Sequence, residues 1–176
     1  MPKISQVVKQ DHDRLKDAYH HLWAVNPEDR DANKFIWELD RYLIVEDMLV
    51  TPALEDHLGK TGKERSRRLS DDYESMNAKL RHMQSFEPTE ASFDSALRAV
   101  WVDLEPHIRE EASGDLDHLE EHMSESDSEA LGKKYEDIKA LLQQPYGVDG
   151  TPDERTLKAL LEMPRQELMV KVGVTR

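Results

Sequence analysis

The chain has 176 residues, a formal net charge of −13 and no cysteine. This length suits a single domain that buries about 70% of its unfolded surface. The negative charge disfavours binding to a phosphate backbone, and the absence of cysteine excludes disulfides, thiolate metal ligands and cysteine nucleophiles.

Apolar residues at helical spacing predict two long helices in the first third of the chain, over residues 5–24 and 32–57. The first carries one continuous face at steps of four and three, made of Val8, His12, Leu15, Tyr19 and Leu22. The second carries Phe35, Leu39, Tyr42, Glu46 and Leu49 at the same alternation. Pro52 lacks a backbone N–H, so it should bend or interrupt the last turns of the second helix.

The middle of the chain predicts a third helix over residues 63–84 and a fourth from after Thr89 to about Met123. Their faces are Leu69, Tyr73, Met76, Leu80 and Met83, then Leu97, Val100, Leu104, His107 and Glu111. Pro106 and the Ser113–Gly114 pair flank the end of the fourth face, which predicts a kink there.

The remaining residues predict one further helix over 126–144 and a short amphipathic helix that begins near Thr151. We therefore expect an all-α protein, an up-down-up-down four-helix bundle with additional C-terminal helices. Residues 1–145 would form the bundle with its extra helix, and residues 146–176 a connector and short helices that pack on it.

Six polar or ionisable side chains lie inside the apolar faces of the four bundle helices. They are His12, Tyr42, Glu46, Tyr73, His107 and Glu111. An uncompensated ionisable group costs several kcal/mol to bury, so these groups must satisfy one another or share a ligand. A metal ion held between the helices would do so with nitrogen and oxygen ligands.

Three stretches of the chain carry a family resemblance, namely Asp11 to Leu15, the block ELDRYLIVEDMLVTPAL from Glu38, and the block LEPHIREEASGDLDHLEE from Leu104. They resemble the hemerythrin-like (HHE cation-binding) family, especially its fungal members. The resemblance covers nearly the whole chain. It implies a four-helix bundle whose non-haem metal, usually a di-iron pair, is held by histidines and two bridging carboxylates.

The resemblance assigns four residues to the metal ligands of this family, namely His12, Glu46, His107 and Glu111. Tyrosines stand where the second and third helices should supply histidine, at Tyr42 and Tyr73. Ionising a phenol at pH 7 costs about 4 kcal/mol, which a trivalent cation offsets better than a divalent one. We therefore expect iron, as one ion rather than two, with both tyrosines as ligands or as hydrogen-bonding neighbours of the ligands.

Such a site predicts a non-haem iron oxidase or oxygenase that acts on a small molecule with dioxygen. Glu46, Glu111, Tyr42 and Tyr73 are then the candidate catalytic groups.

Two other hypotheses fit the same residues. Without metal, two facing carboxyls cannot both stay ionised in a dry interior, so one becomes an acid suited to a cyclase or isomerase. Alternatively, the six groups form only a hydrogen-bonded core, and the bundle binds a partner without catalysis.

The sequence shows neither a membrane-spanning segment nor a secretory signal. No apolar run approaches the roughly 18 residues of a membrane span, and residues 1–10 lack the hydrophobic stretch of a secretory signal. The basic group Lys60, Lys63, Arg65, Arg67 and Arg68 lies among acidic neighbours and is best interpreted as a solvated face. We expect a cytoplasmic monomer or homodimer that binds neither membrane nor nucleic acid.

Overall fold

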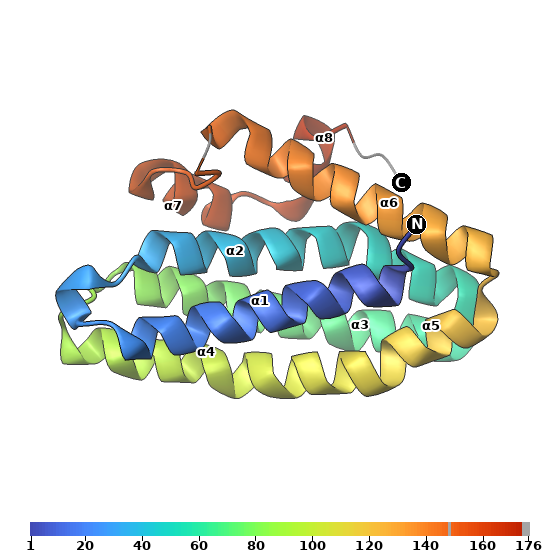
Figure 1. The fold of residues 1–176 in the computed structure, drawn as a ribbon, viewed down its shortest axis with the longest axis horizontal. Helices are drawn as coiled ribbons and strands as arrows, with labels where there is room; N and C mark the ends of the chain where they lie inside the picture. The colour runs from blue at the N-terminus through green and yellow to red at the C-terminus, as the bar shows by residue number, and fades with distance from the viewer. Residues whose placement is uncertain (148, 174–176) are drawn as a thin grey trace.

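Every regular element in the part of the chain that the computed structural model describes, residues 1–147 and 149–173, is helical. The first two helices, α1 (Ile4–Ala24) and α2 (Ala32–Val45), run antiparallel on either side of a short loop that contains η1 (Pro27–Asp29) (Figure 1). The buried residues of α1 include its predicted face. Helix α2 is buried on more than its predicted face, since Ile36, Trp37 and Ile44 are buried as well.

The second bundle helix continues through a wide π turn, η2 (Glu46–Val50), into α3 (Thr51–Gln84). Proline in a regular helix removes one hydrogen bond and clashes with the carbonyl four residues earlier. The π turn lies just before Pro52, and the Thr51 hydroxyl donates to the carbonyl oxygen of Asp47 at 2.8 Å. The irregularity expected from Pro52 is therefore present as a π turn.

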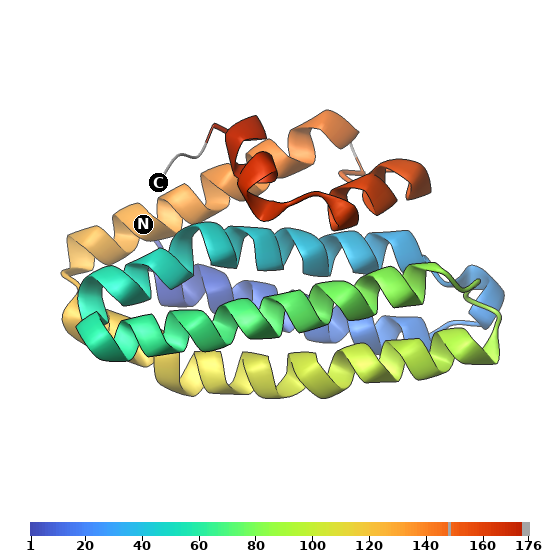
Figure 2. The same ribbon diagram turned by 180° about the vertical axis from the view of Figure 1, so that it is seen from behind.

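Gly59 ends the second bundle helix within the span labelled α3. Its φ of 57° and ψ of −129° are not helical, and a positive φ is strained for residues with a Cβ. The chain reverses here, so the rest of α3 forms the third bundle helix, antiparallel to α2 (Figure 2). This break falls between the predicted second and third helices.

The fourth bundle helix comprises α4 (Ala91–Glu110), a second π turn η3 (Glu111–Asp115), and α5 (Leu116–His122). A π turn holds one more residue than an α turn, which changes the direction in which later side chains point. The irregularity predicted beside the fourth face is therefore present at η3. Both π turns begin at a carboxylate of the predicted site, Glu46 in η2 and Glu111 in η3.

Beyond the four-helix bundle lie α6 (Glu125–Gln143), η4 (Gln144–Tyr146), α7 (Glu154–Glu162) and α8 (Arg165–Lys171). Helix α6 packs against α1 and α2, and α7 packs against α2 and α3. Both views show the three C-terminal helices on one side of the bundle, over α2 (Figures 1 and 2).

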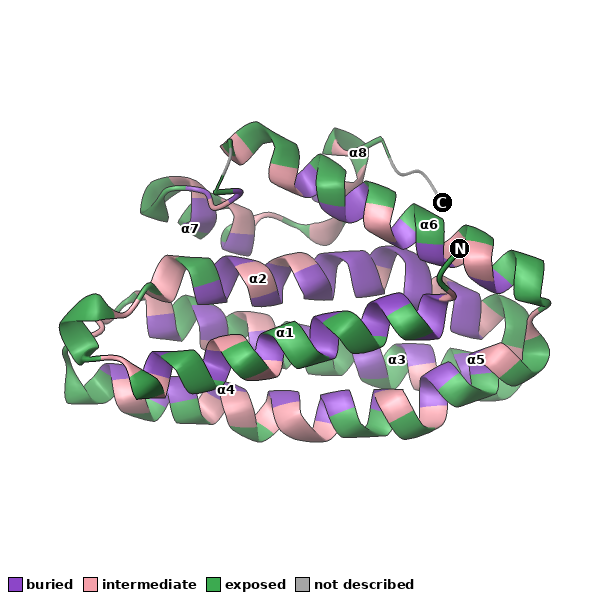
Figure 3. Ribbon diagram, in the orientation of Figure 1, coloured by how far each residue is buried: buried purple, intermediate pink, exposed green. Residues whose placement is uncertain are grey.

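The core lies between the four bundle helices and extends under the C-terminal helices (Figure 3). Leu157 and Leu161 of α7 and Leu168 of α8 belong to the same buried cluster as the bundle residues. The prediction of an all-α bundle with extra C-terminal helices is therefore confirmed. Within the described residues, no helix has both the length and the apolar character needed to cross a bilayer.

Candidate functional site

All six predicted side chains lie together in the interior of the bundle. They come from the four bundle helices, and their exposed fractions run from 0% for Glu46 and Glu111 to 4% for His107. The ring of Tyr42 lies edge-on to the rings of His12 and His107, and the ring of Tyr73 lies edge-on to that of His107. The faces read from the sequence thus do converge on one place.

The hydroxyl of Tyr42 is the centre of a hydrogen-bonded group. It donates to Oε1 of Glu111 at 2.8 Å, and it lies 3.1 Å from Nε2 of His12 and 3.0 Å from Nε2 of His107. His12 Nε2 also lies 2.8 Å from the same Glu111 oxygen. A hydroxyl has one donor and two acceptor positions, so these three neighbours use its full capacity when both imidazoles carry their proton on Nε2.

The other half of the cluster is open. When both carboxyls are ionised, four buried oxygens there have no hydrogen-bond partner in the described part of the chain, namely Oε1 and Oε2 of Glu46, Oε2 of Glu111 and the hydroxyl of Tyr73. A proton on Glu46 lets the two carboxyls bond to each other. Leaving such atoms buried and unpaired costs about 1–3 kcal/mol each, and more when they are charged. A proton or a cation is therefore needed between them.

The pKa values of the Glu46 and Glu111 carboxyls are shifted in opposite directions by their surroundings. Burial, reinforced by the negative charge of Glu111, raises the pKa of Glu46 well above its usual range. Burial alone would also raise the pKa of Glu111, but the hydrogen bond with His12 and the charge of His107 lower it instead. Without a cation, the pair therefore carries a single negative charge, centred on Glu111.

Both phenols keep their protons near neutral pH. Burial is the main cause of the raised pKa of Tyr42 and of Tyr73, and the nearby charges of Glu46 and Glu111 raise both further. Burial alone would lower the pKa of His107, but Asp72 and Glu111 outweigh it and raise the pKa above the usual value. Nδ1 of His107 lies 3.9 Å from the carboxylate of Asp72, a residue of α3.

Three buried groups next to the cluster were not among the predicted site residues. Tyr135 of α6 donates to Asp11 at 2.9 Å, and Nζ of Lys139 donates to the other Asp11 oxygen at 2.6 Å. The charge of Glu46 contributes to the raised pKa of Tyr135, after burial. Tyr135 lies in a face of its own helix with Leu131, Ile138 and Leu142, so the criterion that found Tyr42 and Tyr73 would also have found it.

An ion pair lies beside η3 at the end of the cluster. Nε and Nη2 of Arg65 donate to the two carboxylate oxygens of Asp115, each at 2.7 Å. Asp115 is 4% exposed and ends the π turn that begins at Glu111. Arg65 belongs to the basic group predicted as a solvated face, but its guanidinium ties α3 to this turn.

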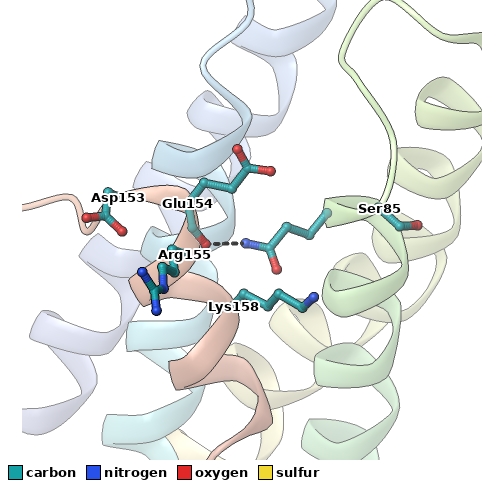
Figure 4. A pocket seen from close by; sticks show the side chains of 6 residues that line it. Ser85, Asp153, Glu154, Arg155 and Lys158 are labelled. Carbon is teal, nitrogen blue, oxygen red and sulfur yellow. Dashed lines mark hydrogen bonds between the residues drawn. The ribbon is translucent and has the colours of Figure 1, made fainter.

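One small cavity reaches the cluster from the seam between α1 and α2. Its volume is about 30 Å³, room for about one water molecule. Its lining is Asp11, Arg14, Leu15, Glu38, Arg41 and Tyr42. A much larger pocket of about 660 Å³ lies between the end of α3 and the start of α7 (Figure 4), and none of the six site residues lines it.

The positions of the potential nitrogen and oxygen ligands limit where this cluster can bind a metal ion. Among residues 1–147 and 149–173, no three His, Asp or Glu side chains are placed to hold one ion together. Both imidazole Nε2 atoms are directed at the Tyr42 hydroxyl, so they leave no shared space for a cation. The oxygens of Glu46, Glu111 and Tyr73 that lack a partner within the described residues are of the type that an oxygen-preferring cation binds.

A helical bundle with carboxyl, imidazole and phenol groups buried between its helices defines a class of candidate cation-binding proteins. Comparison with known proteins identifies the family. The hemerythrin HHE cation-binding domain matches residues 3–119. An uncharacterized hemerythrin-like protein of Schizosaccharomyces pombe is 32% identical over 174 residues, which cover 96% of this chain and 85% of that protein. No solved structure matches. The chain belongs to the hemerythrin HHE cation-binding family.

Proposed function

We propose that this protein holds one iron ion between Glu46, Glu111 and Tyr73 and uses it in the oxygen-dependent oxidation of a small molecule. His107 borders this position, because its Nε2 lies 3.6 Å from Oε2 of Glu111. The observation that carries the proposal is the set of four buried, unpartnered oxygens on these three ligands. One cation would satisfy all four.

The chemistry of the ligands favours iron in the ferric state. Carboxylate and phenolate oxygens suit hard cations. Ionising an ordinary phenol at pH 7 costs roughly 4 kcal/mol, and burial makes it costlier for Tyr73, which a trivalent charge offsets best. When bound, iron supplies one-electron and dioxygen chemistry that the side chains lack. The chain supplies a dry interior and, around Tyr42, a proton held at a defined atom.

The size of the adjoining cavity limits what can approach. A volume of about 30 Å³ suits water or dioxygen, whereas a larger substrate needs the seam between α1 and α2 to open. Of the six site residues, Tyr42 is the one that lines this cavity, and its hydroxyl contacts His12 and His107. Glu111 joins both halves, with Oε1 in the hydrogen-bonded group and Oε2 facing the open one.

Elemental analysis of protein expressed with iron tests the proposal. We expect about one iron per chain and a visible charge-transfer band from ferric tyrosinate. Tyr73→Phe should abolish the band, whereas Tyr146→Phe should keep it, because Tyr146 packs on Trp37 outside the cluster. A colourless preparation that takes up no stoichiometric metal after exposure to Fe(II) in air would refute the proposal.

A metal-free acid–base enzyme, such as a cyclase or isomerase, is the second candidate. The complete hydrogen bonding of Tyr42 favours it, because two imidazoles, a phenol and a carboxylate already form a closed proton network without an ion. Activity that survives strong chelators but is lost in Glu46→Gln would support this candidate. Activity restored only by iron would exclude it.

A further inference from the structure

We infer that the hydroxyl of Tyr42 occupies the position that a second cation would take, and so restricts this bundle to one ion. The inference concerns the hydrogen-bonded half of the cluster, which contains Tyr42, His12 and His107. It rests on the proposed function only for the ion between Glu46, Glu111 and Tyr73. It makes Tyr42 a residue that determines how many ions the protein binds.

The hydroxyl oxygen of Tyr42 is surrounded by atoms of the kinds that bind metal ions. Three ligand-type atoms, Nε2 of His12, Nε2 of His107 and Oε1 of Glu111, lie 2.8–3.1 Å from one phenol oxygen. These are hydrogen-bond lengths. A metal ion at the same point would hold such atoms at about 2.0–2.2 Å, so each would have to move inward by about 0.8 Å. The phenol oxygen and an ion cannot share that point.

The surroundings hold the phenol in place. Tyr42 is 1% exposed, and its ring lies edge-on to both imidazole rings, with centroid separations of 5.8 and 6.0 Å. Rotating the hydroxyl away would break three hydrogen bonds in a buried site. His12 Nε2 and Glu111 Oε1 would keep each other as partners at 2.8 Å, but the buried Tyr42 hydroxyl and His107 Nε2 would lose theirs, at a cost of about 1–3 kcal/mol each. The binding free energy of a second ion would have to exceed this cost.

Tyr42 also determines how Glu111 can be used. The carboxylate accepts from Tyr42 and from His12 through the same oxygen, Oε1, which leaves only Oε2 free for an ion. Glu111 therefore cannot bridge two ions while Tyr42 is present. Tyr73 shows no such arrangement, since its hydroxyl has no partner among the described residues. The two tyrosines thus play different roles at the two halves of the cluster.

The substitution Tyr42→His tests the inference, because histidine withdraws the hydroxyl and supplies a neutral nitrogen ligand. Native protein, Tyr42→His and Tyr42→Phe would each be titrated with Co(II) and with Fe(II) in air. Bound ions per chain are then counted by elemental analysis after gel filtration. We expect Tyr42→His to bind one ion more than native protein. Tyr42→Phe should bind the native number, because it removes the hydroxyl without adding a ligand.

The outcomes separate this inference from the proposed function. If native protein binds one ion and Tyr42→His binds two, both the inference and the proposed function are supported. If native protein binds no ion and Tyr42→His binds one, the inference is supported and the proposed function is refuted. Equal counts in these two proteins overturn the inference, as does an equal gain in Tyr42→Phe, which would indicate general loosening. Should Tyr42→His fail to fold, native protein decides the matter, because saturation at one ion per chain supports the inference, whereas saturation at two ions, or no uptake at all, overturns it.

Discussion

Asp40 offers a direct test of the electrostatics of this interior, because it lies outside the proposed metal ligands. It is 0% exposed on α2, and its Oδ1 accepts from the amide of Asn77 at 3.4 Å. Its other oxygen has no partner within the described residues. Burial raises the pKa of Asp40 from 3.8 to about 6, and the charge of Arg165 and the Asn77 hydrogen bond only partly oppose this rise. The folded protein therefore binds a proton there more tightly than the unfolded chain does.

The sign and size of the effect on stability follow from that difference. A raised carboxyl pKa means that stability falls as the pH increases from 3.8 to about 6. Over this span of about 2 pH units, at about 1.4 kcal/mol per unit, the loss reaches about 3 kcal/mol and stays constant above pH 6. Asp40→Asn removes the charge and keeps an oxygen for Asn77. The variant should be more stable than native protein by about 3 kcal/mol at pH 7.5 and nearly equal at pH 3.5.

Urea denaturation followed by circular dichroism, with a chelator present, measures this difference at both pH values. The substitution Asp137→Asn is a suitable control, since Asp137 pairs with Lys133 on the exposed face of α6. An exposed pair of this kind contributes less than about 1 kcal/mol. The reasoning would be refuted by an Asp40→Asn protein that is less stable than native protein at pH 7.5, or by a gain that does not depend on pH.

Two further changes test the packing around the site. Arg65→Met leaves the buried Asp115 carboxylate without its bidentate partner, and should lower the free energy of unfolding by about 2 kcal/mol. Asp115→Asn added to it should recover part of that loss in the same urea experiment. In thermal unfolding, Gly132→Ala should lower the melting temperature, because its Cβ would lie 2.6 Å from the backbone oxygen of Pro2. Gly114→Ala, which meets no atom within 4 Å, should keep or raise it.

The helices and their inward faces could be predicted because burial imposes a regular spacing that local sequence carries. The faces of the first and third bundle helices are buried as predicted, from Val8 to Leu22 and from Leu69 to Met83. Helix starts were less predictable. Ser124 caps α6, which was expected to begin at residue 126, and Asp153 caps α7, which was expected to begin near Thr151. Neighbouring polar residues can all serve as caps, and packing selects among them.

The contribution of α6 could not be placed from the sequence alone. Periodicity shows that Tyr135 faces inward, but it does not show which side of the bundle the helix covers. The contact with Asp11, from a residue more than a hundred positions away, exists only once α6 packs on α1. Lys139 likewise becomes buried only because Asp11 meets it there at 2.6 Å. Long-range pairing of this kind follows from the tertiary arrangement rather than from local pattern.

The two tyrosines show most clearly why the site needs coordinates. In the sequence, Tyr42 and Tyr73 are the same residue type in the same kind of helical face, and both stand where the family resemblance implies histidine. In the structure, the Tyr42 hydroxyl has three partners, whereas the Tyr73 hydroxyl has none among residues 1–147 and 149–173. A hydroxyl whose bonding capacity is filled gains nothing from a cation, whereas an unpartnered buried hydroxyl does. The difference between the two tyrosines therefore depends on hydrogen-bond directions, which residue spacing does not encode.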